Sequence, residues 1–205
     1  GDFTYTSATD FSGDDSFEYT LSDGQGGETT ATVSIEVNAV NDNPVANDDA
    51  FTGSEGAIVS GNVLTDNGNG ADSDANGDDL KVIAGTFATA QGGSVDVLAN
   101  GDFTYTPAEN FNGADSFDYT LLDGQGGSDT GTVNIEVSAE NDAPVAQDDS
   151  FTVDEDTELT GNVLVDNGNG VDSDVDGDTL NVVAQTVLTA QGGSVDIFAG
   201  GNFSY

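Results

Sequence analysis

Residues Asp172–Asp178 read Asp-Ser-Asp-Val-Asp-Gly-Asp, so carboxylates recur at every second position of one short stretch. Such carboxylates repel one another unless a cation lies among them. Calcium takes about six to eight oxygen ligands in flexible geometry, and a glycine permits the sharp turn that gathers them. The spacing therefore predicts a calcium-binding loop whose ligands are Asp172, Asp174, Asp176 and Asp178.

The same loop occurs one hundred residues earlier, at Asp72–Asp78, where Asn76 replaces Asp176. An amide oxygen can also bind calcium, so we expect a weaker site in this copy. An aspartate precedes each loop, Asp166 in one copy and Asp66 in the other, and is predicted to contribute. The predicted ligands of the earlier copy are Asp66, Asp72, Asp74, Asn76 and Asp78.

A second acidic group surrounds the proline of each Asn-Asp-x-Pro segment. A flexible polar linker is the alternative interpretation, but a proline beside valine and alanine favours a short, stiff connection. We predict that these segments also supply calcium ligands. The residues are Asn41, Asp42, Asp48 and Asp49, with their copies Asn141, Asp142, Asp148 and Asp149.

A third acidic group brackets a predicted strand in two copies, at Asp15 and Asp23 and at Asp115 and Asp123. The ends of that strand could approach the boundary segments and add ligands there. Aspartate serves turns and caps equally often, so both roles stay open for these four residues.

The composition excludes many other functions. The 205 residues include 39 Asp or Glu, one Lys or Arg and no His or Cys, for a formal charge of -38. Without His or Cys, soft-metal chemistry, a thiol nucleophile and an ordinary general base near neutral pH are excluded. Lys81 alone cannot form a phosphate-binding surface, so nucleic acid is not an expected partner. No apolar run is long enough for membrane insertion.

Repeats define the organisation of the chain. Gly1–Thr6 returns as Gly101–Thr106, and Asn41–Ala46 returns as Asn141–Ala146, so the period is 100 residues. A repeat of that length is large enough to be a domain. We predict a complete β-sandwich repeat at 42–141. The C-terminal part of another repeat precedes it, at 1–41, and the N-terminal part of a third follows, at 142–205.

Strong acidity can also indicate disorder, but the apolar residues alternate with polar ones in short runs, which favours β-strands. Predicted strands cover 49–52, 57–64, 80–87, 94–99, 102–106, 116–121 and 130–137, and Asn100-Gly101 predicts a tight hairpin turn. About seven short strands per repeat, with no helical periodicity, predict an all-β fold of tandem immunoglobulin/cadherin-like Greek-key sandwiches. The Phe, Tyr, Val and Ile of these strands are predicted to form the core.

Several motifs in order resemble the cadherin-like or VCBS-type tandem repeats in the extender regions of bacterial RTX adhesins. They are Ala46–Asp49, Gly61–Leu64, Gly101–Tyr119, Asp123–Gly127 and Asp172–Leu180. Asn41–Pro44 also resembles the calcium linker of cadherins. Three differences from the family pattern stand out: Ala143 replaces Asn43 in the second linker, the loop from Asp66 is longer, and the RTX β-roll nonapeptide is absent.

The resemblance implies a calcium-stabilised extender module, with several Ca2+ per repeat and neighbouring repeats as partners. Such modules hold an adhesive tip away from the bacterial cell surface, so an extracellular location is expected. The alternative is a calcium-dependent carbohydrate- or ligand-binding module. Acidity as an adaptation to salt alone is a further reading, and an enzyme is not expected because no nucleophile motif accompanies the carboxylates.

The two partial repeats lead to one more prediction. Residues 142–205 and 1–41 are the front and back parts of one sandwich, and half a sandwich leaves open edges. We expect head-to-tail self-association, in which the two parts pair between molecules. Because the paired surfaces differ, this contact is heterologous and forms an open filament or a closed ring.

Overall fold

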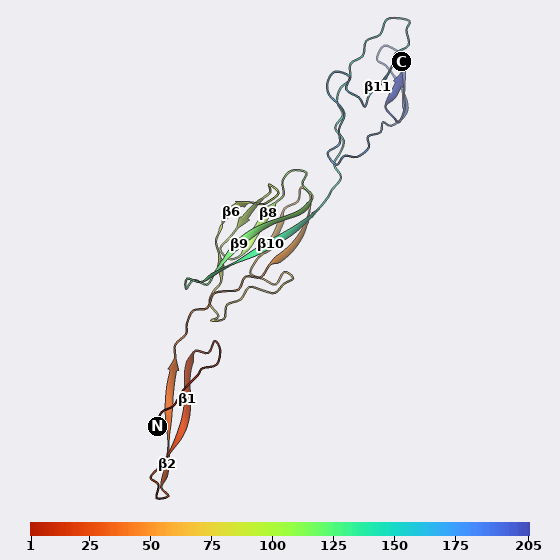
Figure 1. Ribbon diagram of the computed structural model, residues 1–205. Coiled ribbons are helices and arrows are strands. Elements are labelled where there is room, and N and C mark those ends of the chain that lie inside the picture. Colours follow the sequence, from red (N-terminus) through yellow and green to blue (C-terminus); the bar gives the residue numbers. More distant parts are fainter. The chain divides into compact units, whose positions relative to one another are not determined.

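The computed structural model describes residues 1–205, and every regular element in it is a β-strand, which confirms the predicted all-β class. The chain divides into two compact units, Gly1–Ala139 and Glu140–Tyr205, which we describe separately. Within the first unit, β1 (Gly13–Ser22) and β2 (Glu28–Val37) form a two-stranded sheet that we call the N-terminal hairpin (Figure 1). The sandwich that follows it is called the central repeat.

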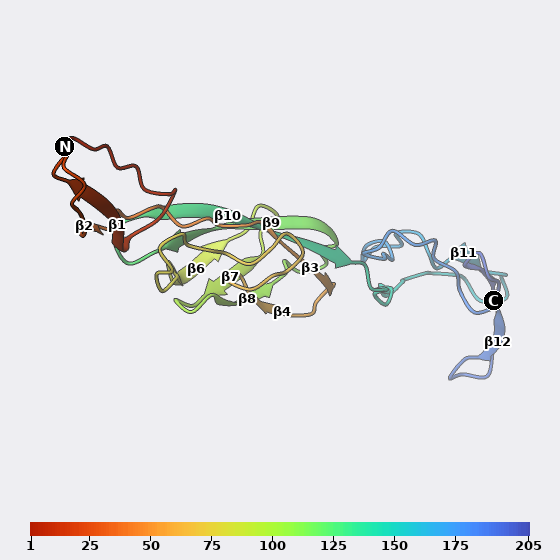
Figure 2. The ribbon, with the colours of Figure 1, turned by 90° about the horizontal axis from the view of Figure 1, so that it is seen from below.

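The central repeat consists of two four-stranded sheets. One has the order β3-β10-β9-β5, with bounds Asp49–Ser54, Ser128–Ser138, Gly113–Leu122 and Lys81–Val82. The other has the order β4-β8-β7-β6, with bounds Val59–Asn62, Asp102–Thr106, Ser94–Val97 and Gly85–Ala88. Strand β3 runs parallel to β10, and all other neighbouring strands are antiparallel. Figure 2 shows β9 and β10 in one layer and β4, β6, β7 and β8 in the other.

The core lies between these sheets, where the predicted alternation places every second side chain. Val133, Ile135 and Val137 of β10 are at most 2% exposed, whereas the residues between them face solvent. Phe103 of β8 meets Phe117 of β9 edge to face, with ring centroids 5.4 Å apart. The rings therefore join the two sheets, as apolar faces of a sandwich do.

Two aromatic rings lie so close to Gly61 in β4 that no larger residue fits at this position. A Cβ at this position would lie 2.4 Å from the ring of Phe51 and 2.8 Å from that of Phe103. Its copy Gly161 is crowded by two phenylalanine rings in the same way. The glycine of the Gly-Asn-Val-Leu motif thus allows β4 to pack against aromatic residues of both sheets.

Two sequence predictions were wrong in detail. The hairpin between β7 and β8 is not a two-residue turn. The backbone N–H of Gly101 donates to the carbonyl of Leu98, and the backbone N–H of Leu98 donates to the carbonyl of Asp102. Of the two predicted turn residues, only Gly101 has a positive φ, +87°. This is a longer turn in which glycine takes the left-handed position. The single strand predicted at 80–87 is instead two strands, β5 and β6, which lie in different sheets, so the repeat has eight strands.

The second unit contains one four-stranded sheet. Its order, β11-β14-β13-β12, repeats the order β4-β8-β7-β6 of the central repeat. The bounds are Thr160–Asn162, Asn202–Ser204, Ser194–Ile197 and Gln185–Leu188. No strand of this unit corresponds to β9 or β10, so the inner face of its sheet is not covered as in the central repeat.

Candidate metal centres

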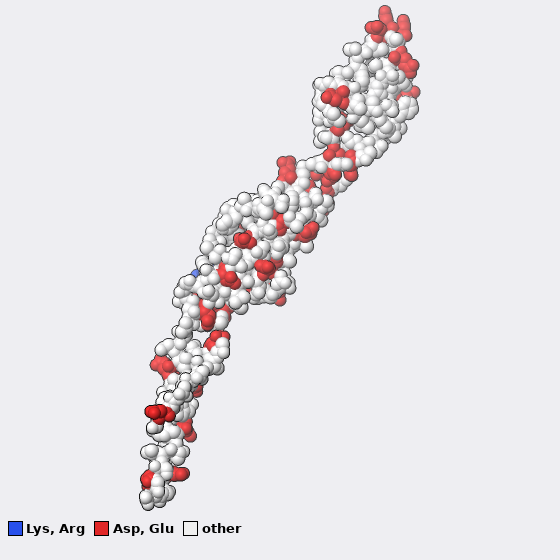
Figure 3. All heavy atoms as spheres, viewed as in Figure 1, with Lys and Arg blue, Asp and Glu red and all other residues white.

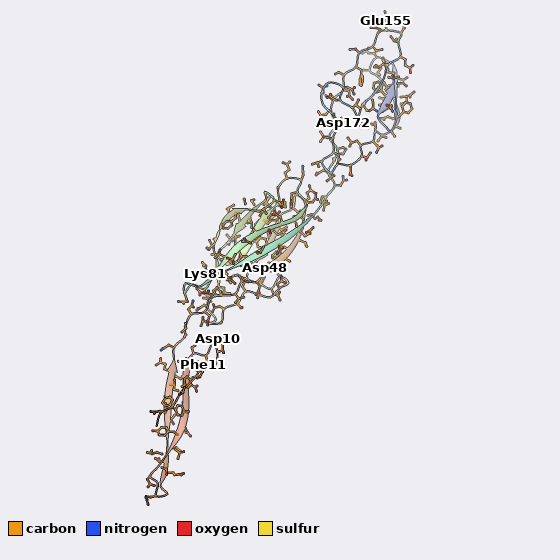
Figure 4. All side chains as sticks on the ribbon, in the orientation of Figure 1. Asp10, Phe11, Asp48, Lys81, Glu155 and Asp172 are labelled. Carbon is orange, nitrogen blue, oxygen red and sulfur yellow. The ribbon has the colours of Figure 1, made fainter.

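Nearly all the charged side chains of the chain are acidic. Lys81 is its only Lys or Arg, and Figure 3 shows carboxylates scattered over the visible face with a single basic patch. Figure 4 labels Asp48 in the central repeat and Asp172 in the second unit, one residue from each of the two groups described below.

The loop of the second unit gathers three of its four predicted ligands. Carboxylate oxygens of Asp174, Asp176 and Asp178 all lie within 4.8 Å of one another. The Asp174 Oδ1 accepts from the backbone N–H of Asp176 and Asp178, at 3.0 and 3.3 Å, and Gly177 turns the chain with φ +78°. Asp172 points elsewhere, because its Oδ1 accepts from the N–H of Gln147 at 2.7 Å.

The corresponding loop of the central repeat has the same turn. Asp74 Oδ1 accepts from the N–H of Asn76 at 2.8 Å and of Asp78 at 3.3 Å, while the other oxygen of Asp74, Oδ2, is buried without a partner. Asn76 contacts the linker: its Oδ1 accepts from the N–H of Asp42 at 2.7 Å and its Nδ2 donates to the carbonyl of Val40 at 3.1 Å. Both loops therefore hold the preceding linker, since Asp176 accepts from Asp142 N–H at 2.7 Å.

A second centre forms around Asp49 at the start of β3. Asp49 is 1% exposed; its Oδ1 accepts from Asn67 at 3.0 Å, and its Oδ2 is buried without a partner. The pKa of Asp49 is raised to about 6, mainly by burial; the hydrogen bond from Asn67 lowers it in part, and the charges of Asp72 and Asp48 raise it. The group therefore brings like charges together at a buried position.

Asp72 connects this centre to the core and to residues that sequence reasoning missed. Its carboxylate accepts from the N–H of Asn47 at 2.8 Å and from the hydroxyl of Tyr119 at 3.0 Å. Burial and the charge of Asp129 raise the pKa of Asp72. The prediction placed Tyr119 only in the core and left Asp129 out. The sequence pattern could have identified Asp129, because the alternation along β10 places it on the same face as the buried Val133.

The remaining predicted ligands of these groups stabilise backbone turns and strand ends. Asp66 accepts from Gly68 and Gly70 N–H at 3.1 Å, and Asp166 does the same in the second unit, which lowers its pKa. Asp48 accepts from Thr132 N–H at 2.9 Å. In the second unit, the carboxylate of Asp149 accepts from the side-chain amide of Asn167 at 2.9 Å. The backbone carbonyl of Asp148 accepts from the side-chain amide of Asn169 at 2.7 Å.

The third predicted group does not form one site, because Asp115 and Asp123 lie at opposite ends of β9. Asp115 is 4% exposed and accepts from the hydroxyls of Tyr105 and Thr89 and from the N–H of Gln91 and Ser116. Four donors leave it little capacity for a metal ion. In the N-terminal hairpin, Asp15 accepts from Tyr5 at 2.8 Å.

Asp123 has a turn role and also contacts the linker. It accepts from the N–H groups of residues 125–127 and from the Asn41 amide at 2.7 Å. The amide of Asn41 and these N–H groups lower the pKa of Asp123. Asp23 accepts from the equivalent N–H groups of Gln25 and Gly27 in the hairpin. Asn141, the copy of Asn41, donates to the carbonyl of Asp142 at 2.8 Å.

The donor set fits a hard cation. Two buried carboxylate oxygens without partners, Oδ2 of Asp49 and Oδ2 of Asp74, lie in groups made of carboxylate and amide oxygens, and the chain contains no Cys or His. Hard oxygen donors of this kind suit Ca2+ and exclude soft metals. A bound cation would also offset the repulsion that raises the pKa of Asp49.

Two four-stranded sheets packed face to face, antiparallel except for the parallel pair β3-β10, define an immunoglobulin-like sandwich. The sequence matches the profile of the bacterial Ig domain three times, over residues 1–36, 41–136 and 141–205. The chain belongs to the bacterial Ig domain family. Domains of this family are structural or adhesion-type extracellular modules and are typically non-enzymatic. No curated protein sequence matches the chain.

Solved structures resemble the chain only distantly. The human desmocollin-1 ectodomain has 14% identity and a TM-score of 0.40, over 89% of this chain and 34% of that one. The endo-fucoidan hydrolase MfFcnA4 from glycoside hydrolase family 107 has 15% identity and a TM-score of 0.38, over 95% and 29%. A nucleoside hydrolase-related protein from Saccharophagus degradans has 17% identity and a TM-score of 0.36, over 50% and 26%.

The chain thus spans about a third or less of each of these structures. At such TM-scores none of the similarities bears on function. No helix in the structure is long and apolar enough to cross a membrane.

Proposed function

We propose that the chain is a calcium-stabilised extender segment of a large secreted bacterial adhesin, in which tandem sandwiches act as a rigid spacer that projects an adhesive tip. The observation that carries this proposal is the contact between each acidic loop and the linker before it. Asn76 and Asp176 accept from the backbone of Asp42 and Asp142 at the same distance, 2.7 Å. An ion bound in the loop would therefore hold the linker as well.

The large negative charge of the chain is the physical reason why bound calcium would stabilise the folded state. A formal charge of -38 over 205 residues opposes a compact state through self-repulsion. Each Ca2+ offsets two of these charges and ties segments that are far apart in the sequence. In the central repeat the ions would be held by Asp74, Asn76 and Asp78 and by the group of Asp48, Asp49 and Asp72. In the second unit they would be held by Asp174, Asp176 and Asp178.

Thermal unfolding with calcium and with a chelator tests this role. A ligand that binds only the folded state stabilises it by about 2.7 kcal/mol per site at one hundred times Kd. We expect a large fall in Tm on chelation, and sodium at equal ionic strength should not restore the Tm. Equal melting temperatures in calcium and chelator would refute calcium stabilisation, and restoration by sodium would indicate salt adaptation instead.

Small-angle scattering tests the spacer role. Asn76→Ala removes both hydrogen bonds from the loop to the linker at Val40 and Asp42. In calcium, this variant should sample shorter and more varied end-to-end distances than the unaltered chain. Asn112→Ala, which precedes β9 at the strand end opposite Asp123, is the control and should not change the scattering curve. A curve unchanged by Asn76→Ala would show that the loop does not stiffen the linker.

A further inference from the structure

The acidic loop of the central repeat contains an asparagine that is followed by a glycine, Asn76-Gly77. Both residues are exposed, and Gly77 takes the left-handed conformation with φ +76°. A Cβ added to Gly77 would meet no atom within 4 Å, so no neighbouring group crowds this turn. Because glycine has no side chain, its backbone nitrogen can approach the side-chain amide of the preceding asparagine. The pair therefore has the composition and the exposure that deamidation requires.

The reaction joins the backbone nitrogen of Gly77 to the amide carbon, Cγ, of Asn76 and breaks the bond from Cγ to the amide nitrogen. The Gly77 nitrogen loses its proton to water, and the amide nitrogen gains a proton and leaves as ammonia. Water then opens the cyclic succinimide at either carbonyl group, which gives aspartate or isoaspartate. The net change is addition of water and loss of ammonia, so no oxidant or other reagent is needed.

The second unit shows that this loop accommodates the aspartate product. Its residue at the equivalent position is Asp176, and the turn is the same, because Gly177 has φ +78°. Asn76 accepts from the linker N–H of Asp42 at 2.7 Å, and Asp176 accepts from that of Asp142 at the same distance. Deamidation to aspartate would therefore keep this hydrogen bond. Either product loses the amide N–H that donates to the carbonyl of Val40.

Hydrogen bonds to the linker hold the amide of Asn76 away from this reaction. Its Nδ2 donates to the carbonyl of Val40 at 3.1 Å, and its Oδ1 accepts from the N–H of Asp42. The attacking group is also engaged, since the N–H of Gly77 donates to the carbonyl of Asp74 at 3.2 Å. Attack requires the amide to leave the linker and fold back over its own peptide. The reaction therefore proceeds from a locally open state in which loop and linker are apart.

The other Asn-Gly pairs of the central repeat are not held by the linker. Three of their amides donate to carboxylate or carbonyl oxygens within the repeat, and these belong to Asn67, Asn69 and Asn100. The fourth, Asn112, is exposed and donates to Glu55 at 3.5 Å, while Gly113 pairs with Val137 at the start of β9. Asn112 is therefore a reference site whose reactivity does not depend on the linker.

We propose that Asn76 is a deamidation site whose reactivity is controlled by the linker. A loop that releases its linker is converted irreversibly, gains one negative charge and loses its donor to Val40. The aspartate product has the acidic composition of the second unit, where carboxylate oxygens of Asp174, Asp176 and Asp178 lie within 4.8 Å of one another. A further consequence rests on the proposed function: a third carboxylate in the loop should strengthen calcium binding there.

Peptide mapping by tandem mass spectrometry tests the site in the full 205-residue chain, aged at mildly alkaline pH with a chelator. Asp42→Pro removes the N–H that bonds Asn76. Deamidation at Asn76 should then accelerate about two- to tenfold, because the loss of one hydrogen bond raises the open population by about that factor. Asp142→Pro, the same change in the second linker, should leave the rate at Asn76 unchanged.

Asn112 is read from the same digests and should react at one rate in all three chains. No deamidation at Asn76, an unchanged rate in the Asp42→Pro chain, or equal acceleration at Asn76 and Asn112 would overturn the proposal. Because the ageing is done in chelator, the result does not depend on calcium binding.

Calorimetric titration with calcium tests the further consequence. Asn76→Asp reproduces the aspartate product and should lower the Kd of this loop for calcium. Asn112→Asp adds the same charge outside the loop and should leave that Kd unchanged. Equal Kd values for the two variants would refute the effect of deamidation on calcium binding. Absence of calcium binding in every chain would refute the proposed function, and the ageing experiment would still decide whether Asn76 is the linker-controlled site.

Discussion

The central repeat and the second unit share a sheet order and most of their motifs, yet they differ in burial. Val95 is fully buried in β7, while its copy Val195 in β13 is only half-buried. The local sequences are nearly the same, and so are the backbone pairings of the two sheets. The difference lies in the opposite sheet, which β9 and β10 supply only in the central repeat. The side chains on the inner face of one sheet are therefore fully buried only when the second sheet packs on them.

The same comparison holds for the acidic network. Asp115 has four donors in the central repeat, from Thr89, Tyr105 and two backbone groups, whereas Thr189 in the second unit has no acceptor. A carboxylate and its donors come from different sheets, so separating the sheets leaves polar groups unpaired. A complete sandwich is thus required for both apolar and polar complementarity.

The largest expected difference in the free energy of unfolding comes from the same substitution at equivalent positions of two repeats. Leu121→Ala should destabilise the central repeat by about 2–5 kcal/mol, because it leaves a cavity at a fully buried position. Leu21→Ala should cost less than about 0.5 kcal/mol in dilute, monomeric protein, because Leu21 is 61% exposed. Urea denaturation followed by circular dichroism measures both. Equal losses would mean that the hairpin face is already covered within the monomer.

The all-β class, the alternation of β9 and β10 and the recurring acidic loops could be predicted from the sequence. Period-2 patterns and the spacing of carboxylates are local, and local patterns survive folding. The group around Asp49 is not local: Asp49, Asp72 and Tyr119 come from segments that only the packed sheets bring together. Asn76 was predicted only as a calcium ligand; its contact with the linker was missed for the same reason, because its two hydrogen bonds join segments far apart in the sequence.

The pH dependence of the calcium-free central repeat should show the effect of Asp49. A carboxyl group whose pKa is raised in the folded state, here to about 6, gives stability that is fully present below about pH 4 and lost as pH rises through 6. The raised pKa of Asp72 acts in the same direction. The groups with lowered pKa, such as Asp123, lose their contribution only below about pH 4.

Without calcium, the central repeat should therefore be more stable at pH 5 than at pH 7, by at most about 3 kcal/mol. Asp49→Asn should reduce this dependence, and Glu136→Gln, at an exposed position of β10, should leave it unchanged. Denaturation midpoints at the two pH values provide the measurement. With calcium the order should reverse, because binding requires ionised carboxylates. A calcium-free midpoint that rises from pH 5 to pH 7 would contradict the buried charge group.

The smallest contrast concerns one hydroxyl. Tyr105→Phe removes the 2.8 Å hydrogen bond to Asp115 inside the core and should cost about 1–2 kcal/mol. Tyr205→Phe should cost almost nothing, because Tyr205 is 45% exposed and no strand of its unit corresponds to β9, which carries Asp115 in the central repeat. Urea denaturation midpoints of the two variants provide the measurement, and equal costs at the two positions would contradict the contribution assigned to the hydrogen bond between Tyr105 and Asp115.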